Sequence, residues 1–211
     1  MKQNTYTYIL LTLCFMGMCA CSGDNNQPQV NKHFTMDTPF AEANAIYYGP
    51  FYQDLGITTQ VFEMEFYTEG LTIDSLGNLT GTGYHLYITD LFAQTTDSIP
   101  PQGTYTIDSI NYGQPFTIMP GKKFTAELAV GAQLTHVGSE FISTYLLDTG
   151  TLTLQWQGDT AHVKFDMLTT SQDKLQTEFY GTLPVYYIEY NTEKYANSKM
   201  QRKKYAKKHV L

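Results

Sequence analysis

The stretch that decides the fold is residues 151–167, TLTLQWQGDTAHVKFDM. Apolar and polar residues alternate in both of its halves, with the period of two that is typical of a strand with one buried face. A Gln-Gly-Asp-Thr segment at 157–160 separates the halves and has the composition of a tight turn. The pattern therefore predicts an antiparallel β-hairpin. The side chains that it places on one face are Leu152, Leu154, Trp156, Val163, Phe165 and Met167.

The same alternation recurs at 60–67, where apolar residues take one face and Glu63 and Glu65 take the other, predicted to be solvated. Strand-like runs separated by Gly, Asn, Asp and Pro are typical of an antiparallel sheet, and one-face alternation disfavours a parallel one. Together the segments predict an all-β domain of about ten strands, an antiparallel β-sandwich, with a closed lipocalin-like barrel as the alternative. The further strand candidates are 84–89, 104–107, 124–130, 141–147 and 177–183.

The N-terminal residues have the layout of an export signal. Lys2 precedes an apolar run that is too short to span a bilayer, and a small residue precedes Cys21. Residues 18–22 (MCACS) resemble a bacterial lipobox, which implies that Cys21 carries the lipid; the alternative is a plain secretory signal. Many lipoproteins of the inner membrane have Asp where this chain has Ser22. The resemblance therefore implies an outer-membrane lipid anchor, with the domain periplasmic or exposed at the cell surface.

Composition divides the chain into four parts. We expect a lipoprotein signal peptide at 1–20, a flexible polar tether at 21–39, a β-sandwich domain at 40–189 and a basic tail at 190–211. All three cysteines lie at or before Cys21, so none remains for a disulfide, a thiolate nucleophile or a metal site. The domain must therefore be stabilised by packing.

Charge is distributed unevenly along the chain. All twenty acidic residues lie within 24–193, where the net charge is −15, whereas 194–211 holds seven basic residues and no acidic one. Apolar residues of the tail recur every five positions, a spacing that forms no apolar face on a helix. We therefore expect a solvated tail. The anions that it would meet on an exported protein are lipid A phosphates, acidic glycans or the acidic body of the chain, and not nucleic acid.

Four segments follow one another in an order that resembles a known group of proteins. They are 81–86 (GTGYHL), 99–106 (IPPQGTYT), 149–154 (TGTLTL) and 179–183 (FYGTL). Together they resemble Bacteroides-type surface lipoproteins of largely unassigned function. The resemblance implies a β-sandwich-like domain on the cell envelope and brings no catalytic residue. The basic tail departs from that pattern.

Four Asp-Ser or Asp-Thr pairs followed by an apolar residue resemble the O-glycosylation acceptor of the same bacteria. The resemblance implies modification at Ser75, Ser98, Ser109 and Thr160, each in an exposed loop. The alternative is that Asp-Ser and Asp-Thr favour turns, because their side chains bond to nearby backbone groups.

Aromatic residues supply the candidate ligand site. Tyr47, Tyr48 and Tyr52 flank Gly49-Pro50, which suggests a loop or edge with exposed rings, and exposed Tyr stacks on sugars and anchors protein interfaces. The alternative is cross-strand packing of these rings. Trp156 alternates with two leucines, so we place it in the core.

No pattern in the sequence predicts catalysis, a metal or a cofactor. The five histidines are not spaced as a local zinc motif, and no nucleophile elbow, P-loop or dinucleotide-binding glycine pattern is present. Glu63, Glu65 and Glu69 invite comparison with the paired carboxylates of glycosidases, yet the first two are predicted on a solvated face. We therefore expect a non-enzymatic protein.

Three functions are compatible with these observations. The first is a membrane-anchored envelope lipoprotein that acts as a non-catalytic binding or accessory module for a glycan or an envelope protein. The second is a lipocalin-like carrier that holds an apolar small molecule inside a closed sheet. The third is a surface hydrolase, which needs two carboxylates, or a histidine with a carboxylate, in one cleft. We rank them in this order.

Overall fold

The computed structural model describes residues 34–74, 78–123 and 129–187, which belong to one compact unit, His33–Leu211. The predicted signal peptide at 1–20, residues 21–33 of the predicted tether with Cys21, Ser75 and the tail at 190–211 lie outside the described residues.

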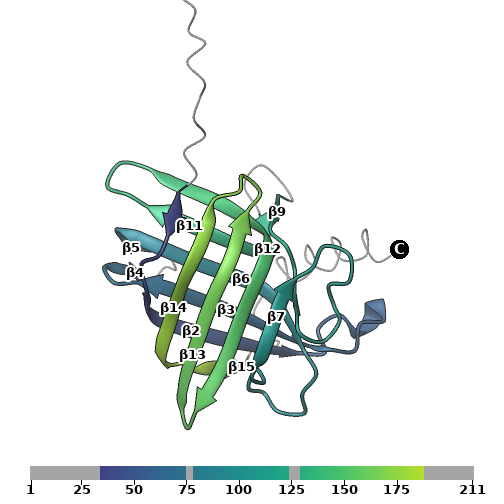
Figure 1. The fold of residues 1–211 in the computed structure, drawn as a ribbon. Helices are drawn as coiled ribbons and strands as arrows, with labels where there is room; N and C mark the ends of the chain where they lie inside the picture. Colours follow the sequence, from purple (N-terminus) through teal and green to yellow (C-terminus); the bar gives the residue numbers. More distant parts are fainter. Residues whose placement is uncertain (1–33, 75–77, 124–128, 188–211) are drawn as a thin grey trace, which may run out of the picture. The chain divides into compact units, whose positions relative to one another are not determined.

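The described chain consists of strands and one short 3₁₀ turn (Figure 1). Its elements are β1 (Thr35–Met36), β2 (Phe40–Gly49), η1 (Gln53–Leu55), β3 (Gln60–Thr68), β4 (Leu71–Ile73), β5 (Leu79–Gly81), β6 (Gly83–Ala93), β7 (Gly103–Ile107), β8 (Thr117–Ile118), β9 (Lys122–Lys123), β10 (Ala129–Val130), β11 (Ala132–Val137), β12 (Ile142–Gln157), β13 (Thr160–Thr169), β14 (Lys174–Thr182) and β15 (Val185–Tyr187). The all-β fold predicted from the sequence is confirmed.

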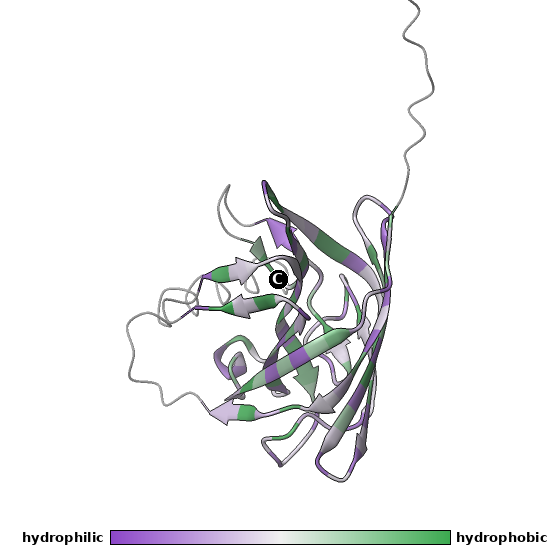
Figure 2. Cartoon of the chain, turned by 90° about the vertical axis from the view of Figure 1, so that its left-hand side faces the viewer, coloured by the Kyte–Doolittle hydropathy of each residue, from purple (hydrophilic) through white to green (hydrophobic). Residues whose placement is uncertain are grey.

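Eleven of the strands form one large sheet that folds over on itself. In Figure 1, β12, β13 and β14 lie in front of β2, β3 and β6, and the strands of the two groups cross. Green and purple segments alternate along several strands in Figure 2, as expected where a strand buries one face. The arrangement is consistent with the predicted β-sandwich, in which two layers bury a shared core.

The pairing differs from a purely antiparallel sheet. Antiparallel pairs connect the long strands, whereas β1 with β14, β14 with β2, β15 with β2, and β7 with β8 pair in parallel. These parallel pairs are short, and the one between β14 and β2 is a single match of Phe179 with Phe40. The sheet is therefore mixed, with parallel pairing confined to short contacts.

Strand β12 belongs to both layers. Its first part pairs with β11 and its later part pairs with β7 and β13, with a register shift between Leu147 and Thr149. Gly150, with φ +117°, follows this shift and lies against the backbone of β13, where a Cβ atom would approach Asp166 O to 2.3 Å. Two strands were predicted at 141–147 and 151–156. One bent strand forms instead, because the bulge and glycine turn the chain without ending its pairing.

The space between the layers is filled with aromatic rings. The Phe66 ring lies 4.9 Å from that of Phe165, 5.7 Å from that of Phe40 and 5.7 Å from that of Phe179, measured between centroids. All four side chains are buried, with at most 4% of their surface exposed. Such packing supplies the stability that a domain without cysteines needs.

A second apolar cluster covers the opposite face of β3 and β6. The chain turns after β2 and returns over that face through η1, so that Phe51 and Tyr52 pack on Val61 and Phe92. The segment between β7 and β8 adds Tyr112 to the same cluster. Strand β3 is consequently buried on both faces, although its alternating sequence predicted burial of only one.

The domain begins earlier than the predicted boundary at residue 40. Strand β1 pairs with β14, Met36 is 2% exposed, and the Phe34 backbone N–H donates to Asp173 Oδ1 at 3.1 Å. The last residues of the predicted tether are thus part of the fold, because their apolar side chains cover the edge of the core. The predicted strand at 124–130 lies mostly outside the described residues, and β10 is its described end.

Candidate functional site

The aromatic residues proposed as a ligand site do not form an exposed loop. Tyr48 is 7% exposed and Tyr52 is fully buried, and Tyr47 is half-buried at the end of β2. The Tyr52 hydroxyl donates to Asp90 Oδ1 at 2.7 Å, so its polar end is satisfied inside the protein. The prediction of exposed rings at Tyr48 and Tyr52 was wrong, because the chain after Gly49 folds back over the sheet and buries them in the second apolar cluster.

Tyr47 has contacts of its own. Its hydroxyl donates to Gln60 Oε1 at 2.8 Å, and its ring packs on Phe62 and meets Tyr187 of β15 edge-on. Trp156 packs against the main core, as predicted, while its indole N–H donates to Pro100 O at 3.0 Å. These rings therefore serve cross-strand and loop packing, the alternative weighed for the aromatic residues.

The described O-glycosylation candidates differ in exposure. Ser109 is exposed in the loop after β7, whereas Ser98 and Thr160 are half-buried, and the Ser98 hydroxyl contacts the hydroxyl of Tyr187. Backbone N–H groups of Asn111 and Ile110 donate to the Asp108 carboxylate and lower its pKa. Asp108 thus stabilises a turn through its side chain. Among the described candidates, Ser109 is the most exposed.

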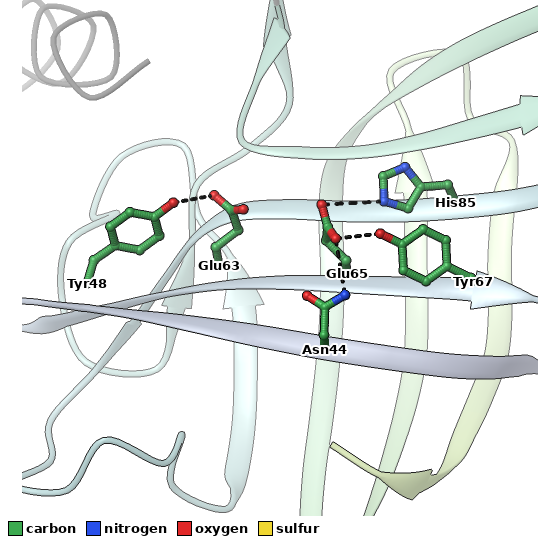
Figure 3. Close-up of polar contacts among 6 residues, drawn as sticks. All are labelled: Asn44, Tyr48, Glu63, Glu65, Tyr67 and His85. Carbon is green, nitrogen blue, oxygen red and sulfur yellow. Dashed lines mark hydrogen bonds and ion pairs between the residues drawn. The ribbon is translucent and has the colours of Figure 1, made fainter. Parts of the chain in front are cut away.

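Polar side chains converge on the face of β3 that was predicted to be solvated. Glu63 is only 4% exposed and accepts a hydrogen bond from the Tyr48 hydroxyl at 2.9 Å. Glu65, half-buried, accepts from Asn44 Nδ2 at 3.2 Å and from the Tyr67 hydroxyl (Figure 3). The predicted solvated acidic face is therefore wrong, because neighbouring strands and the returning chain shield it. We name Asn44, Tyr48, Glu63, Glu65, Tyr67 and His85 the β3 polar cluster.

His85 occupies the β6 side of the β3 polar cluster. Its ring stacks on Tyr67 with centroids 4.6 Å apart and planes 6° apart, and its Nε2 lies 3.9 Å from Glu65 Oε1. Burial lowers the pKa of His85 to about 4, so the imidazole is neutral at pH 7. His85 Nε2 is buried and makes no hydrogen bond, while burial and the bond to Glu65 raise the pKa of Tyr67. The hydrogen bonds described for Glu63 and Glu65 thus come from two tyrosine hydroxyls and an amide.

The β3 polar cluster contains the residue types of a hydrolase without the arrangement that one requires. A general base must be within hydrogen-bond reach of a substrate proton, beside a cleft that admits the substrate. Glu65 already accepts two hydrogen bonds, Glu63 is almost fully buried, and neither of the two grooves described below is lined by these residues. Glu69 is exposed in the turn after β3. Glu63 and Glu65 are thus both engaged in hydrogen bonds within the sheet.

A groove of about 500 Å³ crosses the outer face of β12, β13 and β14. The segment between β1 and β2 forms one wall with Asp37 and Pro39. Side chains alternate between the two faces of each strand, and the outward positions of these three strands are polar. The pairing of β13 with β14 places Lys164 opposite Glu178 and Asp166 opposite Gln176 on this outer face. Thr151, Thr153 and Thr177 add hydroxyl groups to its lining, and Phe165 adds an aromatic ring. The groove is therefore open, polar and built on regular strands.

Two carboxylates of this groove are paired with basic side chains beside it. Lys174 Nζ lies 3.4 Å from Asp166 Oδ1, and His162 Nε2 donates to Glu178 Oε2 at 2.9 Å. That hydrogen bond is the main cause of the lowered pKa of Glu178. Tyr180 lies two residues after Glu178 on the same face of β14. Its exposed ring packs edge-on against His162, with the ring centroids 5.8 Å apart. The surface thus combines paired hydrogen-bonding groups with an exposed aromatic ring.

The sequence indicated only one strand of this groove. The outward positions of β13, occupied by His162, Lys164 and Asp166, were recognised as the polar side of a strand. Their partners on β14 come from the next strand of the chain, but the wall at Asp37 comes from more than a hundred residues earlier, so spacing alone did not join them. Cross-strand matching of outward polar residues is the signal that would have found the site.

A second groove, of about 450 Å³, lies between two loops. Residues 55–59 and 110–115 line most of it, including Ile110, which is 84% exposed. Within the described ranges, no three histidine, cysteine or acidic side chains are grouped to hold a metal ion. The described part of the chain also contains no helix with the length and apolar character of a membrane span.

Comparison with known proteins finds no match: no family model, no curated protein and no solved structure is similar enough to this chain to count as one.

Proposed function

We propose that the chain is a lipid-anchored envelope lipoprotein that acts as a non-catalytic binding module, and that its ligand is a glycan held in the groove over β12, β13 and β14. The observation that carries the proposal is the composition of that groove. Acidic, basic, amide and hydroxyl groups line it, and two of its carboxylates, Asp166 and Glu178, are already paired with Lys174 and His162.

Such a surface suits a neutral ligand rich in hydroxyl groups. Carboxylate and amide oxygens accept from sugar hydroxyls, while Lys164 and the Gln176 amide donate to them. Tyr180, with 64% of its surface exposed, supplies a ring on which a sugar can stack. The groove is open rather than enclosed and spans three strands, so a chain of several sugars fits it better than a single small molecule.

The other two functions receive less support from the geometry. A carrier of an apolar ligand needs an internal cavity, and the rings of Phe40, Phe66, Phe165 and Phe179 fill the space between the layers. A hydrolase needs acid and base groups free to react, whereas Glu63 and Glu65 accept hydrogen bonds within the protein, and in the groove Asp166 is paired with Lys174 and Glu178 with His162. Binding in the groove over β12, β13 and β14 requires neither.

The lipid anchor is tested by replacing its attachment residue. We expect Cys21→Ala expressed in a bacterium with lipoprotein processing to leave the membrane fraction, because each acyl methylene contributes about 0.8 kcal/mol to membrane binding. Fractionation followed by detergent phase separation and mass measurement of the mature N-terminus gives the result. Cys19→Ala is the matched control and should remain membrane-bound. A Cys21→Ala protein that still partitions with membranes would contradict the anchor.

Glycan binding is tested with the soluble chain from Ser22. We expect saturable binding to at least one bacterial or host polysaccharide on an array, and about fivefold weaker binding after Tyr180→Ala, because a lost aromatic contact is worth about 1 kcal/mol. Glu178→Gln should weaken binding as well, since the amide alters the bond with His162. Calorimetry with the best glycan gives the affinities.

Tyr186→Ala is the matched control for Tyr180→Ala, because Tyr186 is 58% exposed on β15, whereas Tyr180 follows the groove residue Glu178 on the same face of β14. It should bind like the unmodified chain, and circular dichroism should show the same fold for all variants. Equal loss in both tyrosine variants would place the site elsewhere. Binding to no glycan would overturn the proposal in favour of a protein ligand.

A further inference from the structure

The turn between β11 and β12 presents two neighbouring apolar side chains to solvent. Phe141 and Ile142 are 57% and 67% exposed. They come directly after a tight turn, in which the Gly138 N–H donates to Phe141 O at 2.9 Å. Single exposed apolar residues are common on protein surfaces, whereas large ones grouped together mark an interaction site. We name residues 138–142 the β11–β12 tip.

A row of rings from neighbouring strands supports the Phe141 ring. It packs edge-on against His136, with centroids 5.6 Å apart, and His136 stacks on Tyr84 of β6 at 4.5 Å. The pairing of β11 with β6 places Tyr84 directly opposite His136. The tight turn and the ring row together hold Phe141 in an exposed position before any partner arrives. A contact made by such a preorganised side chain loses little conformational entropy.

The N-terminal end of the described chain lies close to this tip. Phe34, the first described residue, packs its ring on that of Tyr145, with centroids 5.0 Å apart. Tyr145 comes four residues after Phe141, so at about 3.3 Å per residue the tip lies about 13 Å further along the strand. Strand β1 and the turn between β11 and β12 both lie at the upper left of Figure 1. The chain therefore enters the fold beside its exposed apolar tip.

The length of chain before Phe34 limits how far this end can be from a lipid anchor. Cys21, the proposed attachment residue, precedes Phe34 by thirteen residues. A fully extended chain of this length spans about 45 Å at most. A domain attached in this way stays close to the bilayer, and the tether gives the tip a high effective concentration at the lipid surface. Two apolar side chains are then enough for a reversible contact.

The composition of the tip selects an apolar surface. From Gly138 to Tyr145 the sequence contains one charged residue, Glu140, and no basic one. Electrostatic attraction to an anionic partner is therefore not what this segment offers. Phenylalanine and isoleucine gain free energy when they leave water for hydrocarbon, and the hydrocarbon nearest to a lipidated chain is the bilayer itself.

We propose that the β11–β12 tip inserts Phe141 and Ile142 into the lipid bilayer that holds the anchor. The proposal rests on the lipid anchor of the proposed function and adds a second membrane contact to it. Docking at the tip gives the tethered domain a defined orientation. It leaves the groove over β12, β13 and β14 open, since Thr151 and Thr153 lie ten and twelve residues beyond Phe141 along the chain.

Quenching by brominated lipid tests the insertion without depending on lipidation in a cell. The chain 21–211 contains a single cysteine, Cys21, whose thiol can be coupled to a maleimide lipid in phosphatidylcholine vesicles. In the variant Phe141→Trp we expect brominated phosphatidylcholine to quench the fluorescence of the added tryptophan. The unmodified chain, with Trp156 alone, gives the background.

Ile110→Trp is the matched control for Phe141→Trp. Ile110 is 84% exposed and follows β7, which pairs with β12 at Thr151–Leu154, far along the strand from the tip. A tryptophan at 110 should keep its fluorescence in brominated vesicles. Adding Ile142→Ser to Phe141→Trp should lower the ratio of docked to free domains about tenfold, because a large apolar side chain no longer leaves water.

The proposal is overturned if tryptophan at 141 is quenched no more than tryptophan at 110, or if Ile142→Ser leaves the quenching unchanged. A tip that is not quenched, in a chain that forms a dimer lost in Phe141→Ser, would belong to a second copy and not to the bilayer. Failure of the anchor is a separate result, since it appears in the Cys21→Ala fractionation and leaves the vesicle measurement unaffected.

Discussion

Gly150→Ala is expected to lower the free energy of unfolding by about 4 kcal/mol, through strain at positive φ and overpacking against a neighbouring strand. Gly150 adopts φ +117°, which an alanine rarely tolerates. An added Cβ atom would lie 2.3 Å from Asp166 O and 2.5 Å from Met167 Cα, both backbone atoms of β13. Neither atom can move without breaking the pairing of β12 with β13. Urea unfolding of the soluble chain from Ser22 measures the loss.

Gly158→Ala is the matched control for this prediction. Gly158 also has a positive φ, +60°, but no atom lies within 4 Å of its added Cβ. It lies in the turn between β12 and β13, so the substitution should cost only about 1 kcal/mol, the penalty of the left-handed conformation. If both variants lose equal stability, the close approach at Gly150 is not what constrains β12.

Phe66→Ala is expected to destabilise the fold by about 4 kcal/mol, the usual loss when a buried phenylalanine leaves a cavity. Phe66 is fully buried, and its ring contacts those of Phe40, Phe165 and Phe179, which come from both layers. No cysteine in the domain compensates for the lost packing. Thermal and urea unfolding, followed by near-ultraviolet circular dichroism, give the change.

Phe141→Ala is the control, because Phe141 is 57% exposed before β12 and should change stability by less than about 0.5 kcal/mol. Similar stability of the Phe66→Ala and unmodified chains would mean that the core adjusts to fill the space. That outcome would also support the alternative function, a carrier of an apolar small molecule, since a core that adapts to lost volume can also accept an apolar ligand.

Much of the fold could be predicted from local patterns. The hairpin at 151–167 forms as expected, with Leu154 opposite Val163 and Gln157 opposite Thr160 across the turn. Alternation identified it because each strand has one face on the core and one in solvent. The same rule predicted a solvated second face for β3, but the chain that follows β2 covers that face. It also missed β2, where half-buried residues on both faces leave no clear period.

The candidate sites depend on longer-range contacts. The Tyr48–Glu63 and Tyr52–Asp90 bonds join residues 15 and 38 positions apart, and no spacing rule connects them. The outward residues of β13 were recognisable, but the wall that Asp37 adds to them comes from more than a hundred residues earlier. The aromatic prediction at Tyr47, Tyr48 and Tyr52 failed for this reason, because burial is a property of the folded neighbours.

By itself, the sequence determined the fold class, the central hairpin and the separation of an acidic body from a basic tail. These follow from local alternation, turn composition and charge, which each segment carries wherever it lies. Only the tertiary structure decided that β12 is one bent strand, that the carboxylates of β3 are shielded, and that a polar groove crosses β12, β13 and β14. These features arise where distant segments meet, because shielding and cross-strand register depend on which neighbour covers each face.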